Sequence, residues 1–450
     1  MNLPNYFIAD LPPEHAVTPQ LVTEACQALK RNREQYLAGR TTASIVGVLS
    51  ATAQSWLDQN NSFRRLALER GVNETGFSEQ TLARGLDAFF KQFTVENLNA
   101  LIAQDLGHVE RLDRFTTDRI SDTSAFARGP DLLVHITAGN IPSPTILGIA
   151  LGFLTRSAQF VKCARGTSLL SRLFAHSIYE VEPKLASCLE IAEWPGGTTP
   201  LEQALFAEAD SVTATGSDAT LAAIRQRLPE RIRFLGYGHR VSFGYVTAEA
   251  LARFELTKTL RGAARDVAAW DQLGCLSPHV FYVEHGGAVS VEQFAGLLAA
   301  ELATIESTEP RGRLDVEAAS AIALKRSFYE VRAATAGDVK LWQSEHSTAW
   351  TVVYEADPQF QLSCLNRFIY VKPVPDLNEA LRYCERIHGK VSTVGLAGSG
   401  ESAQQHAMQL ARWGATRICR LGEMQNPPLT WRHDGRPALG DLITWTDWEG

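Results

Sequence analysis

Residues 131–166 read DLLVHITAGNIPSPTILGIALGFLTRSAQFVKCARG, and no other segment says as much about the fold class. The segment opens with a short apolar run, Leu132–Ile136, and continues with residues of helical character, Thr145–Ser157. It ends with a second strand-like run, Gln159–Lys162. A strand, a helix and a second strand within about thirty residues are typical of a parallel β-α-β unit. The segment therefore predicts a parallel, doubly wound sheet.

The same alternation extends along the chain in both directions. Before residue 131, helix-start signals at Thr18-Pro19, Ser78 and Thr94 each precede a segment with helical apolar spacing. Further strands are expected at 189–194, 211–215, 231–235, 280–284, 351–354, 368–371, 392–396 and 417–420, with helices from about residues 201, 218, 290, 315, 376 and 401 between them. We therefore predict an α/β chain with two doubly wound parallel-sheet domains and a helical N-terminal part. Ligands of such sheets bind beyond the carboxyl ends of the strands.

The composition excludes several classes of partner. The 450 residues include 45% hydrophobic and 21% charged residues, with a net charge of −7, which indicates a globular protein of about two or three domains. No long basic run is present, so nucleic acids and anionic membranes are not expected as main partners. The longest apolar run, Ile146–Leu154, is too short to cross a bilayer, so no membrane insertion is expected.

The cysteine pattern indicates a reducing compartment. The cysteines are scattered, without Cys-x-x-Cys pairs, at positions 26, 163, 188, 275, 364, 384 and 419. Such a pattern predicts reduced thiols and argues against a metal site. The N-terminus lacks a basic region followed by an apolar run, so no signal peptide is read and a cytoplasmic protein is expected.

Cys275 is the first candidate for chemistry and lies in the segment Trp270–His279. A glycine precedes the cysteine and Leu-Ser-Pro follows it, which suits a nucleophile presented to a cleft. A lone cysteine is more often an inert residue of the core. Possible partners for a thiolate elsewhere in the chain favour the catalytic interpretation.

His239 and Asn140 are the candidate partners of this thiol. His239 lies in a glycine-rich loop after an expected strand, and a histidine near a cysteine can take its proton and hold it as a thiolate. Asn140 follows the strand Leu132–Ile136, between a glycine and a proline, and its amide could serve an oxyanion hole. The alternatives stay open: a histidine satisfied within its loop, and an Asx-turn at Asn140.

Two positions could bind a dinucleotide, although no Gly-x-Gly-x-x-Gly motif follows any expected strand. Gly216 and Ser217 precede a helix, where backbone N–H groups and a hydroxyl can hold a phosphate. An ordinary helix N-cap is the simpler interpretation of this turn. Lys162 and Arg165 end a strand where the ribose of a dinucleotide would lie, with solvated surface charge as the alternative.

The order of these pieces resembles the aldehyde dehydrogenase superfamily and, more narrowly, the LuxC family of acyl-CoA reductases of bacterial luminescence. The matching motifs cover about residues 130 to 450: Ala138-Gly-Asn-Ile-Pro142, Gly216-Ser-Asp218, Gly236-Tyr-Gly-His-Arg-Val-Ser-Phe-Gly244, Asp271-Gln-Leu-Gly-Cys-Leu-Ser-Pro278, Leu365-Asn-Arg-Phe-Ile-Tyr-Val-Lys-Pro-Val374, Met424-Gln-Asn-Pro-Pro-Leu429 and His433-Asp-Gly-Arg-Pro437.

The resemblance implies a fold and a domain plan. It implies an aldehyde-dehydrogenase-like chain with a cleft between its two domains. N-terminal helices and an NADP(H)-binding domain would occupy residues 1–244, and a catalytic domain with the nucleophilic cysteine would occupy 245–425. A C-terminal tail, 426–450, would pack near the cleft or a subunit interface.

The resemblance also implies an activity, the NADPH-dependent reduction of a fatty acyl thioester to an aldehyde. Cys275 would be the acylated nucleophile, and Asn140 with the Cys275 backbone N–H would hold the oxyanion. The loop at Gly236-Tyr-Gly-His239 lacks the Glu with which aldehyde-oxidising members of the superfamily activate water. That absence fits reduction, because hydrolysis would compete with hydride transfer. The superfamily's Glu that holds the nicotinamide ribose has no match at Cys364–Arg367.

Cofactor preference and partners follow from the same resemblance. Superfamily members that use NAD often carry a Glu three residues after the strand lysine, where this chain has Arg165, so NADPH is expected. The thioester could arrive on CoA, on a carrier protein or from a partner acyltransferase or acyl-protein synthetase, and a homo-oligomer is expected. Two rival functions remain: an aldehyde dehydrogenase working oxidatively, and a non-catalytic carrier-binding subunit of a reductase complex.

Overall fold

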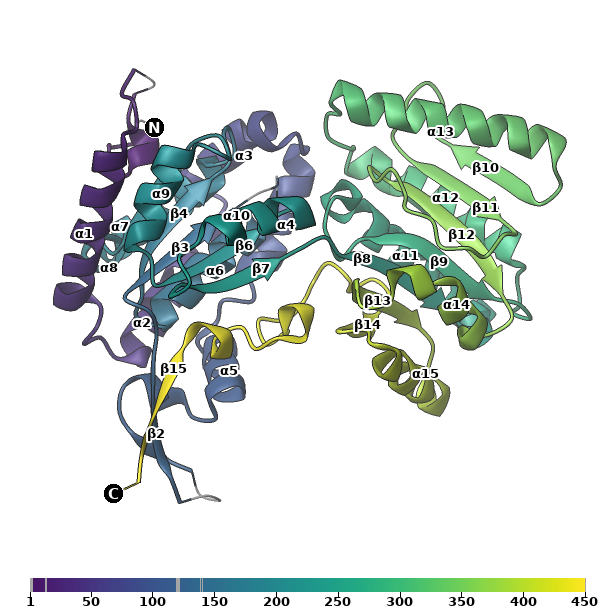
Figure 1. The fold of residues 1–450 in the computed structure, drawn as a ribbon. Coiled ribbons are helices and arrows are strands. Elements are labelled where there is room, and N and C mark those ends of the chain that lie inside the picture. The colour runs from purple at the N-terminus through teal and green to yellow at the C-terminus, as the bar shows by residue number, and fades with distance from the viewer. Residues whose placement is uncertain (1–2, 13, 119–121, 138, 140, 450) are drawn as a thin grey trace.

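The computed structural model describes residues 3–12, 14–118, 122–137, 139 and 141–449. Figure 1 shows two sheet-containing lobes side by side and a small sheet that projects from the first lobe. The N-terminal helices are α1 (Pro19–Tyr36), α2 (Thr42–Leu57), α3 (Ser62–Thr75), α4 (Glu79–Phe90) and α5 (Val95–Leu106). The side chains of Thr18, Ser78 and Thr94 cap α1, α4 and α5 by accepting a backbone N–H three residues later. The three helix starts expected from the sequence are therefore confirmed.

The first lobe contains a five-stranded sheet in the order β5-β4-β3-β6-β7, with every pair parallel. Its strands and helices alternate: β3 (Leu132–Ile136), α6 (Ser143–Leu154), β4 (Ala158–Cys163), α7 (Leu169–Val181), α8 (Pro183–Ala186), β5 (Leu189–Glu193), α9 (Thr199–Glu208), β6 (Ser211–Thr215), α10 (Asp218–Arg227) and β7 (Arg233–Tyr237). The strand order reverses at β3, so the carboxyl ends of β3, β4 and β6 meet at one edge. This is the doubly wound sheet that the sequence predicts.

The second lobe contains a seven-stranded sheet in the order β10-β11-β12-β9-β8-β13-β14. Its elements are β8 (Val241–Val246), α11 (Arg253–Ala268), β9 (Pro278–Glu284), α12 (Val291–Thr308), α13 (Val316–Thr335), β10 (Val339–Gln343), β11 (Thr351–Glu355), β12 (Phe368–Val374), α14 (Leu377–Tyr383), β13 (Val391–Ala397), α15 (Gly400–Trp413) and β14 (Ile418–Arg420). Only the edge strand β10 is antiparallel to its neighbour within the described residues. The predicted fold class, α/β with parallel sheets in two domains, is confirmed.

The two lobes differ from the sequence-based expectation at their junction. The strand β8 was not expected, and β7 begins two residues later than the predicted run 231–235. The chain crosses from the first sheet to the second between Tyr237 and Val241, a few residues before position 244, where the sequence analysis placed the domain boundary. This crossing lies beside the cysteine loop, because Ser242 of β8 pairs with Pro278 of β9.

A third sheet was not expected and joins distant parts of the chain. It contains β1 (Thr116–Thr117), β2 (Ser124–Arg128) and β15 (Thr444–Trp448), all antiparallel. Figure 1 shows the C-terminal segment leaving the second lobe, passing the junction and reaching β2 beside the first lobe. No helix among the described residues has the length and apolarity needed to cross a membrane.

The N-terminal helices share one core with the first lobe. Trp56 of α2 is fully buried, and its Nε1 donates a hydrogen bond of 2.8 Å to Ser177 Oγ of α7. Trp270, in the cysteine loop of the second lobe, belongs to the same buried cluster and packs against Phe77 with ring centroids 5.2 Å apart. Burial of this indole ties the cysteine loop to the N-terminal helices.

Candidate active site

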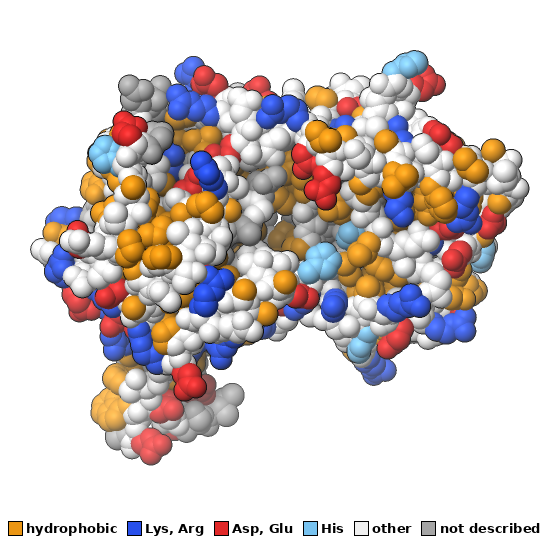
Figure 2. Space-filling view, turned by 45° about the horizontal axis from the view of Figure 1, so that its top comes forward, with side chains coloured by type: hydrophobic (Ala, Val, Ile, Leu, Met, Phe, Trp, Pro, Cys, Tyr) orange, Lys and Arg blue, Asp and Glu red, His pale blue; other side chains and the backbone are white. Residues whose placement is uncertain are grey.

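Cys275 lies between a short 3-10 helix, η4 (Ala269–Gln272), and the first residue of β9. Its side chain is exposed, whereas the other cysteines are buried or half-buried. The backbone carbonyl of Cys275 accepts a hydrogen bond of 2.8 Å from Ser242 Oγ of β8. Figure 2 shows the surface hollowed between the two lobes. The prediction that Cys275 faces solvent as a nucleophile would is thus consistent with its position.

Two strained loops face each other next to this cysteine. The consecutive residues Trp270, Asp271 and Gln272 have positive φ angles of 52°, 48° and 66°. The consecutive residues 365–367 also have positive φ angles, of 63°, 56° and 64°. Each such residue costs about 1–2 kcal/mol unless the surroundings compensate. Six residues with this strained backbone, in two runs of three, require strong contacts between the loops.

Hydrogen bonds of Gln272 provide part of that compensation. The Gln272 amide donates to the carbonyls of Pro278 and Phe368 at 2.7 and 2.9 Å, and its oxygen accepts from Phe368 N at 2.8 Å. The side chain is fully buried. One glutamine therefore joins both strained loops to the start of β9 and β12.

A buried ion-pair network provides the rest. Arg367 Nε lies 3.0 Å from Asp271 Oδ1, and its Nη1 lies 2.8 Å from Glu306 Oε2. The other Asp271 oxygen accepts from Gly312 N at 3.0 Å. The Arg367 side chain is 1% exposed. Because the paired charges satisfy each other away from water, this network fixes the base of the loop that presents Cys275.

The C-terminal segment supports the loop from its other side. Gln425 Nε2 donates to Ser277 Oγ at 2.5 Å. A Cβ on Gly274 would lie 2.9 Å from the Gln425 amide nitrogen, so a larger residue there would displace the end of the Gln425 side chain from its present position. The glycine that precedes Cys275 therefore leaves room for the Gln425 amide beside the loop.

The surroundings of Cys275 oppose ionisation of its thiol. Burial among surrounding protein atoms, followed by the negative charge of Asp434, raises the pKa of Cys275 to about 11, while the Arg240 guanidinium acts in the opposite direction. Asp434 and Arg240 form an ion pair with 3.1 Å between Oδ1 and Nε. With this arrangement, the resting thiol is almost entirely protonated at neutral pH.

His239 is exposed and lies between the two lobes. Its backbone N–H donates to Asp218 Oδ1 at 3.2 Å, which fixes the loop against the start of α10. Burial, with a smaller electrostatic effect of the nearby His239, lowers the pKa of His279, four residues beyond Cys275, to about 4. No hydrogen bond joins the His239 ring to Cys275 among the described residues, so the predicted pairing requires a ring movement.

His279 is a neighbour that the sequence analysis did not single out. Its Nδ1 accepts the backbone N–H of Ser363 at 3.1 Å, and its side chain is buried. Because Nδ1 accepts, the proton of the neutral ring is on Nε2. The ring stays neutral at ordinary pH and orders the loop before the strained residues 365–367.

The expected cofactor residues lie at the carboxyl ends of β4 and β6. Lys162 is buried, with Nζ 6.0 Å from the centroid of the Trp194 ring, so it is not the solvated surface charge of the alternative interpretation. Burial lowers the pKa of Lys162, against the opposing charge of Glu202. Arg165 is exposed in the turn after β4, where Gly166 N donates to Glu193 Oε1 at 2.6 Å. A buried and an exposed cation thus flank this edge.

Gly216 and Ser217 lie between β6 and the N-terminus of α10. Ser217 Oγ accepts the backbone N–H of Thr220 at 3.2 Å, so the hydroxyl serves as an N-cap. The backbone N–H groups of the first turn still point out of the helix, where they can bind a phosphate. Asn140 lies outside the described residues, and its expected role in an oxyanion hole stays a prediction.

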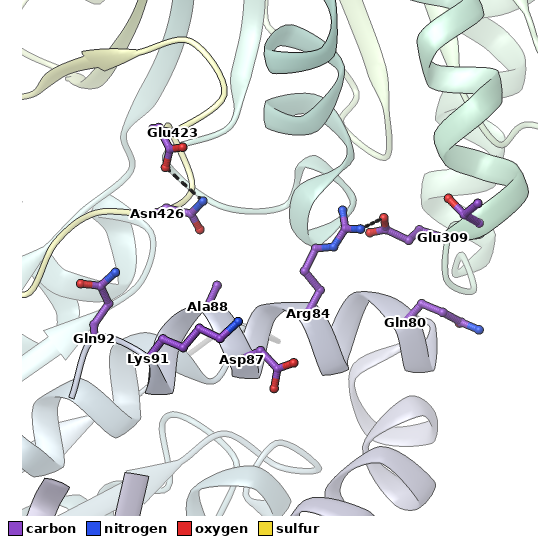
Figure 3. Close-up of a pocket in the computed structure, with 10 residues that line it drawn as sticks. Gln80, Arg84, Asp87, Ala88, Lys91, Gln92, Glu309, Glu423 and Asn426 are labelled. Carbon is purple, nitrogen blue, oxygen red and sulfur yellow. Dashed lines mark hydrogen bonds and ion pairs between the residues drawn. The ribbon is translucent and has the colours of Figure 1, made fainter. Parts of the chain in front are cut away.

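A pocket of about 690 Å³, lined mainly by charged and amide-bearing residues, lies between α4, the end of α12 and the segment 423–426. Figure 3 shows Arg84 of α4 and Lys91, just after the end of α4, along one wall, with Glu423 and Asn426 opposite. Arg84 is ion-paired with Glu309, and Gln425, between the two opposite residues, contacts the cysteine loop as described above. Its amides and charged groups suit a polar part of a substrate better than an acyl chain.

The residues that the sequence analysis missed share one property. Arg240, Asp271, Arg367 and Asp434 all lie in the quoted motifs, yet received no role. Each acts through a partner that is distant in sequence. The available signal was a charged residue inside an otherwise apolar or glycine-rich motif, which indicates a position but not a partner.

Comparison with known proteins identifies relatives along nearly the whole chain. The profile of the LuxC family, described as acyl-CoA reductase, matches residues 37–445. A long-chain acyl-protein thioester reductase from Photorhabdus laumondii is 24% identical over 415 residues, which cover 90% of this chain and 82% of the relative. The protein of that description from Aliivibrio fischeri is 24% identical over 417 residues, with coverage of 90% and 82%.

Solved structures show the same fold at lower sequence identity. A NAD-dependent benzaldehyde dehydrogenase from Corynebacterium glutamicum superposes with a TM-score of 0.70 and 13% identity, covering 96% of this chain and 91% of the dehydrogenase. The aldehyde-dehydrogenase-like fold expected from the sequence is thereby confirmed.

Proposed function

The chain belongs to the LuxC family of acyl-CoA reductases, and from that premise we propose that it reduces a long-chain acyl thioester to the aldehyde, with NADPH as reductant and an acyl-enzyme on Cys275. The observation that carries this proposal is the exposed thiol on a loop held rigidly at the junction of the two lobes. The names of the relatives support a thioester as substrate.

The chain's own residues account for the first half of the reaction. The Cys275 sulfur attacks the acyl carbonyl carbon as its proton passes to His239, and the C–S bond to the carrier breaks. The carrier sulfur leaves as a thiol with that proton. The backbone N–H of Cys275, with the Asn140 amide, is proposed to stabilise the oxyanion, each such donor being worth about 3 kcal/mol in the barrier.

The second half needs a hydride. The nicotinamide, when bound, would supply the hydride to the carbonyl carbon of the Cys275 thioester. The C–S bond to Cys275 would then break to release the aldehyde, and the Cys275 sulfur would take a proton from water, so the enzyme returns to its starting state. The N-terminus of α10 with Gly216 and Ser217 is proposed to hold the phosphates, and Lys162 with Arg165 the adenine ribose.

The lack of a free carboxylate in the loop Gly236–His239 favours reduction of the acyl-enzyme over its hydrolysis. The loop Gly236–His239 carries no carboxylate that could activate water. Asp434 is the carboxylate that raises the pKa of the Cys275 thiol, and it is ion-paired with Arg240. The acyl-enzyme is therefore expected to last until hydride arrives, which counts against the oxidative alternative.

The deciding experiment measures aldehyde formation. We expect the purified protein to consume NADPH and release one aldehyde per acyl group from a long-chain acyl-CoA, with the aldehyde trapped as a hydrazone. Label from the acyl chain should remain on Cys275 when NADPH is omitted. Aldehyde oxidation that outpaces thioester reduction would favour the oxidative function, and the absence of both reactions would favour a carrier-binding subunit. A partner acyl-protein synthetase can be added to test whether it replaces CoA as donor.

Changing His239 tests the proposed base. We expect His239→Ala to slow acylation by roughly 10²-fold, because the thiol then loses its proton acceptor. Since the pKa of Cys275 is raised to about 11, the thiolate fraction grows with pH up to that value, and raising the pH should restore part of the rate. Single-turnover acylation across a pH series measures this. A loss that is equal at every pH would assign His239 a structural role.

Changing Arg165 tests cofactor choice. An arginine can grip the 2′-phosphate of NADPH with two hydrogen bonds, a contact worth about 1.5–3 kcal/mol. We expect the unmodified enzyme to prefer NADPH, and Arg165→Glu to lower the ratio of kcat/KM for NADPH over NADH by roughly one to two decades. Arg165→Gln should fall between them. A preference that is unchanged in Arg165→Glu would show that this side chain faces away from the cofactor.

A further inference from the structure

The C-terminal segment 422–443 spans both lobes, and we call it the strap (Figure 1). Near its start, the backbone N–H of Met424 donates to Asp266 Oδ1 of α11 at 3.0 Å, which holds the strap on the second lobe. Near its end, the backbone N–H of Leu439 donates to Asp105 Oδ2 of α5 at 2.8 Å, which holds it on the first lobe. The strap is therefore a second connection between the lobes, in addition to the chain crossing from β7 to β8.

The middle of the strap packs on that crossing, residues 237–241. The His433 ring stacks on Tyr237, with ring centroids 4.7 Å apart and planes 8° from parallel. The guanidinium carbon of Arg436 lies 4.6 Å from the centroid of the same tyrosine ring. Stacked rings and a cation over an aromatic face both attract, so the strap restrains the first residue of the crossing.

An ion pair holds the other end of the crossing. Asp434 Oδ1 lies 3.1 Å from Arg240 Nε, and the Asp434 side chain is 6% exposed. A tight turn with a φ of 55° at Asp434 presents this carboxylate. The three side chains that contact the crossing all belong to the motif His433–Pro437, which the proposed function leaves without a role.

The crossing is joined in turn to the loop proposed for the cofactor phosphates. The Tyr237 carbonyl accepts the backbone N–H of Gly216 at 3.2 Å. The backbone N–H of His239 donates to Asp218 Oδ1, at the start of α10, at 3.2 Å. A Cβ on Gly238 would lie 2.5 Å from that oxygen, so the crossing lies directly against the turn. A displacement of Tyr237 is therefore passed to the Gly216 turn.

The strap and the crossing also contact the loop of the proposed nucleophile. Gln425 of the strap donates from Nε2 to Ser277 Oγ at 2.5 Å, two residues beyond Cys275. Ser242, the residue after the crossing, donates from Oγ to the Cys275 carbonyl at 2.8 Å. The relative position of the cofactor turn and the thiol thus depends on how firmly the strap holds the crossing.

We propose that His433 is a positioning residue that, by stacking on Tyr237, holds the Gly216 turn in register with the Cys275 loop for hydride transfer. Hydride transfer requires the donor and acceptor carbons in near-attack geometry, and a displacement of about 1 Å can slow such a step by roughly 10²-fold. The role requires the ring face of His433 and not its proton. The inference rests on the proposed function in taking the Gly216 turn as the cofactor site and Cys275 as the acylated thiol.

Amide hydrogen exchange tests the connection without any substrate, because the Gly216 N–H is itself the donor to Tyr237. His433→Ala removes the stack and leaves the neighbouring ion pair in place. We expect the Gly216 amide to exchange roughly threefold to tenfold faster in this variant. His433→Phe keeps a flat aromatic ring and should exchange like the unmodified protein. Mass spectrometry of the peptides that cover residues 214–220 measures the exchange.

Single-turnover kinetics test the consequence for the reaction. The Cys275 acyl-enzyme is formed first from acyl-CoA and is then mixed with NADPH that carries deuterium at the transferred position, beside unlabelled NADPH. We expect His433→Ala to slow this reduction roughly tenfold, with a primary isotope effect, because misplaced reactants slow the hydride step itself. His433→Phe should restore the rate.

His388→Ala is the matched control for both measurements. His388 lies against the Trp413 ring, with ring centroids 5.3 Å apart, and belongs to neither the strap nor the crossing. Loss of this contact removes a histidine from an aromatic partner as His433→Ala does. It should leave the Gly216 exchange and the hydride step unchanged.

The outcomes separate this inference from the proposed function. Unchanged Gly216 exchange in His433→Ala, equal changes in His388→Ala, or faster exchange with an unchanged hydride step would overturn the positioning role. A slow His433→Phe enzyme would assign the effect to the imidazole proton and overturn it too. Should His433→Ala not fold, Tyr237→Leu removes the other ring of the stack and decides by the same measurements. Faster exchange in a protein that reduces no thioester would refute the proposed function and leave the hold of the strap on the turn standing.

Discussion

Replacing Cys275 with alanine is expected to abolish both acylation and reduction while the protein stays folded. The thiolate is the only proposed nucleophile, so no covalent route to the aldehyde remains. Alanine retains the Cβ, and Cys275 belongs to none of the buried hydrophobic clusters of the described residues, so its loss leaves no cavity in a core. The measurements are acyl label retained on the protein and NADPH oxidation with acyl-CoA, beside a thermal unfolding scan.

Cys364→Ala is the matched control for this result. Cys364 is half-buried on the loop next to the strained residues 365–367, and burial raises its pKa to about 11, as at Cys275. We expect that acyl-CoA does not label Cys364, and that the Cys364→Ala enzyme keeps its activity. Acyl label that survives in Cys275→Ala and disappears in Cys364→Ala would move the nucleophile to the neighbouring loop.

Replacing Arg367 with methionine is expected to produce the largest loss of stability. The guanidinium is the common partner of Asp271, Glu306 and the Glu309 carbonyl. Its removal leaves buried negative charge unpaired, which costs about 3–5 kcal/mol. The strained loops then lose their connection, so acylation of Cys275 should also slow. Urea unfolding followed by tryptophan fluorescence measures the stability, with Trp270 in the affected loop as a reporter.

An exposed arginine serves as control for Arg367. Arg382 is ion-paired with Glu379 on the surface of α14, where solvent screens the pair, and Arg382→Met should leave the unfolding midpoint unchanged. Arg367→Lys should recover only part of the loss, because an ammonium cannot reproduce the several directed bonds of the guanidinium. A midpoint for Arg367→Met equal to that of the unmodified protein would show that Gln272 alone holds the two loops.

Secondary structure was predictable where it depends on neighbouring residues. The helix-start signals at Thr18, Ser78 and Thr94 were recognised in the sequence, and each of these side chains caps its helix in the structure. The strand β8 was missed because Gly244 interrupts its apolar pattern. That glycine is required by tertiary packing, since a Cβ there would lie 2.2 Å from the Phe281 ring. The start of β7 is likewise set by pairing of Arg233 with Ser211 of β6.

Some residues of the candidate site could be predicted from the sequence, and others could not. Cys275, Lys162, Arg165 and the Gly216-Ser217 turn could be located because each follows or precedes a strand or helix with a recognisable local pattern. Their functional assignments rest on the position of those residues at the ends of strands. The charge partners could not be located, because the pairing of Arg240 with Asp434 depends on a C-terminal segment that crosses from one lobe to the other.

The sequence by itself determined the fold class, the family and the residue that carries the thiol, since apolar period, helix caps and motif order are properties of short segments. Only the tertiary structure decided what surrounds that thiol. Asp271 meets Arg367 and Asp434 meets Arg240 because distant loops converge at the junction of two sheets. The strength of a charge interaction depends on distance and on exclusion of water, and neither quantity is encoded in the spacing of residues along the chain.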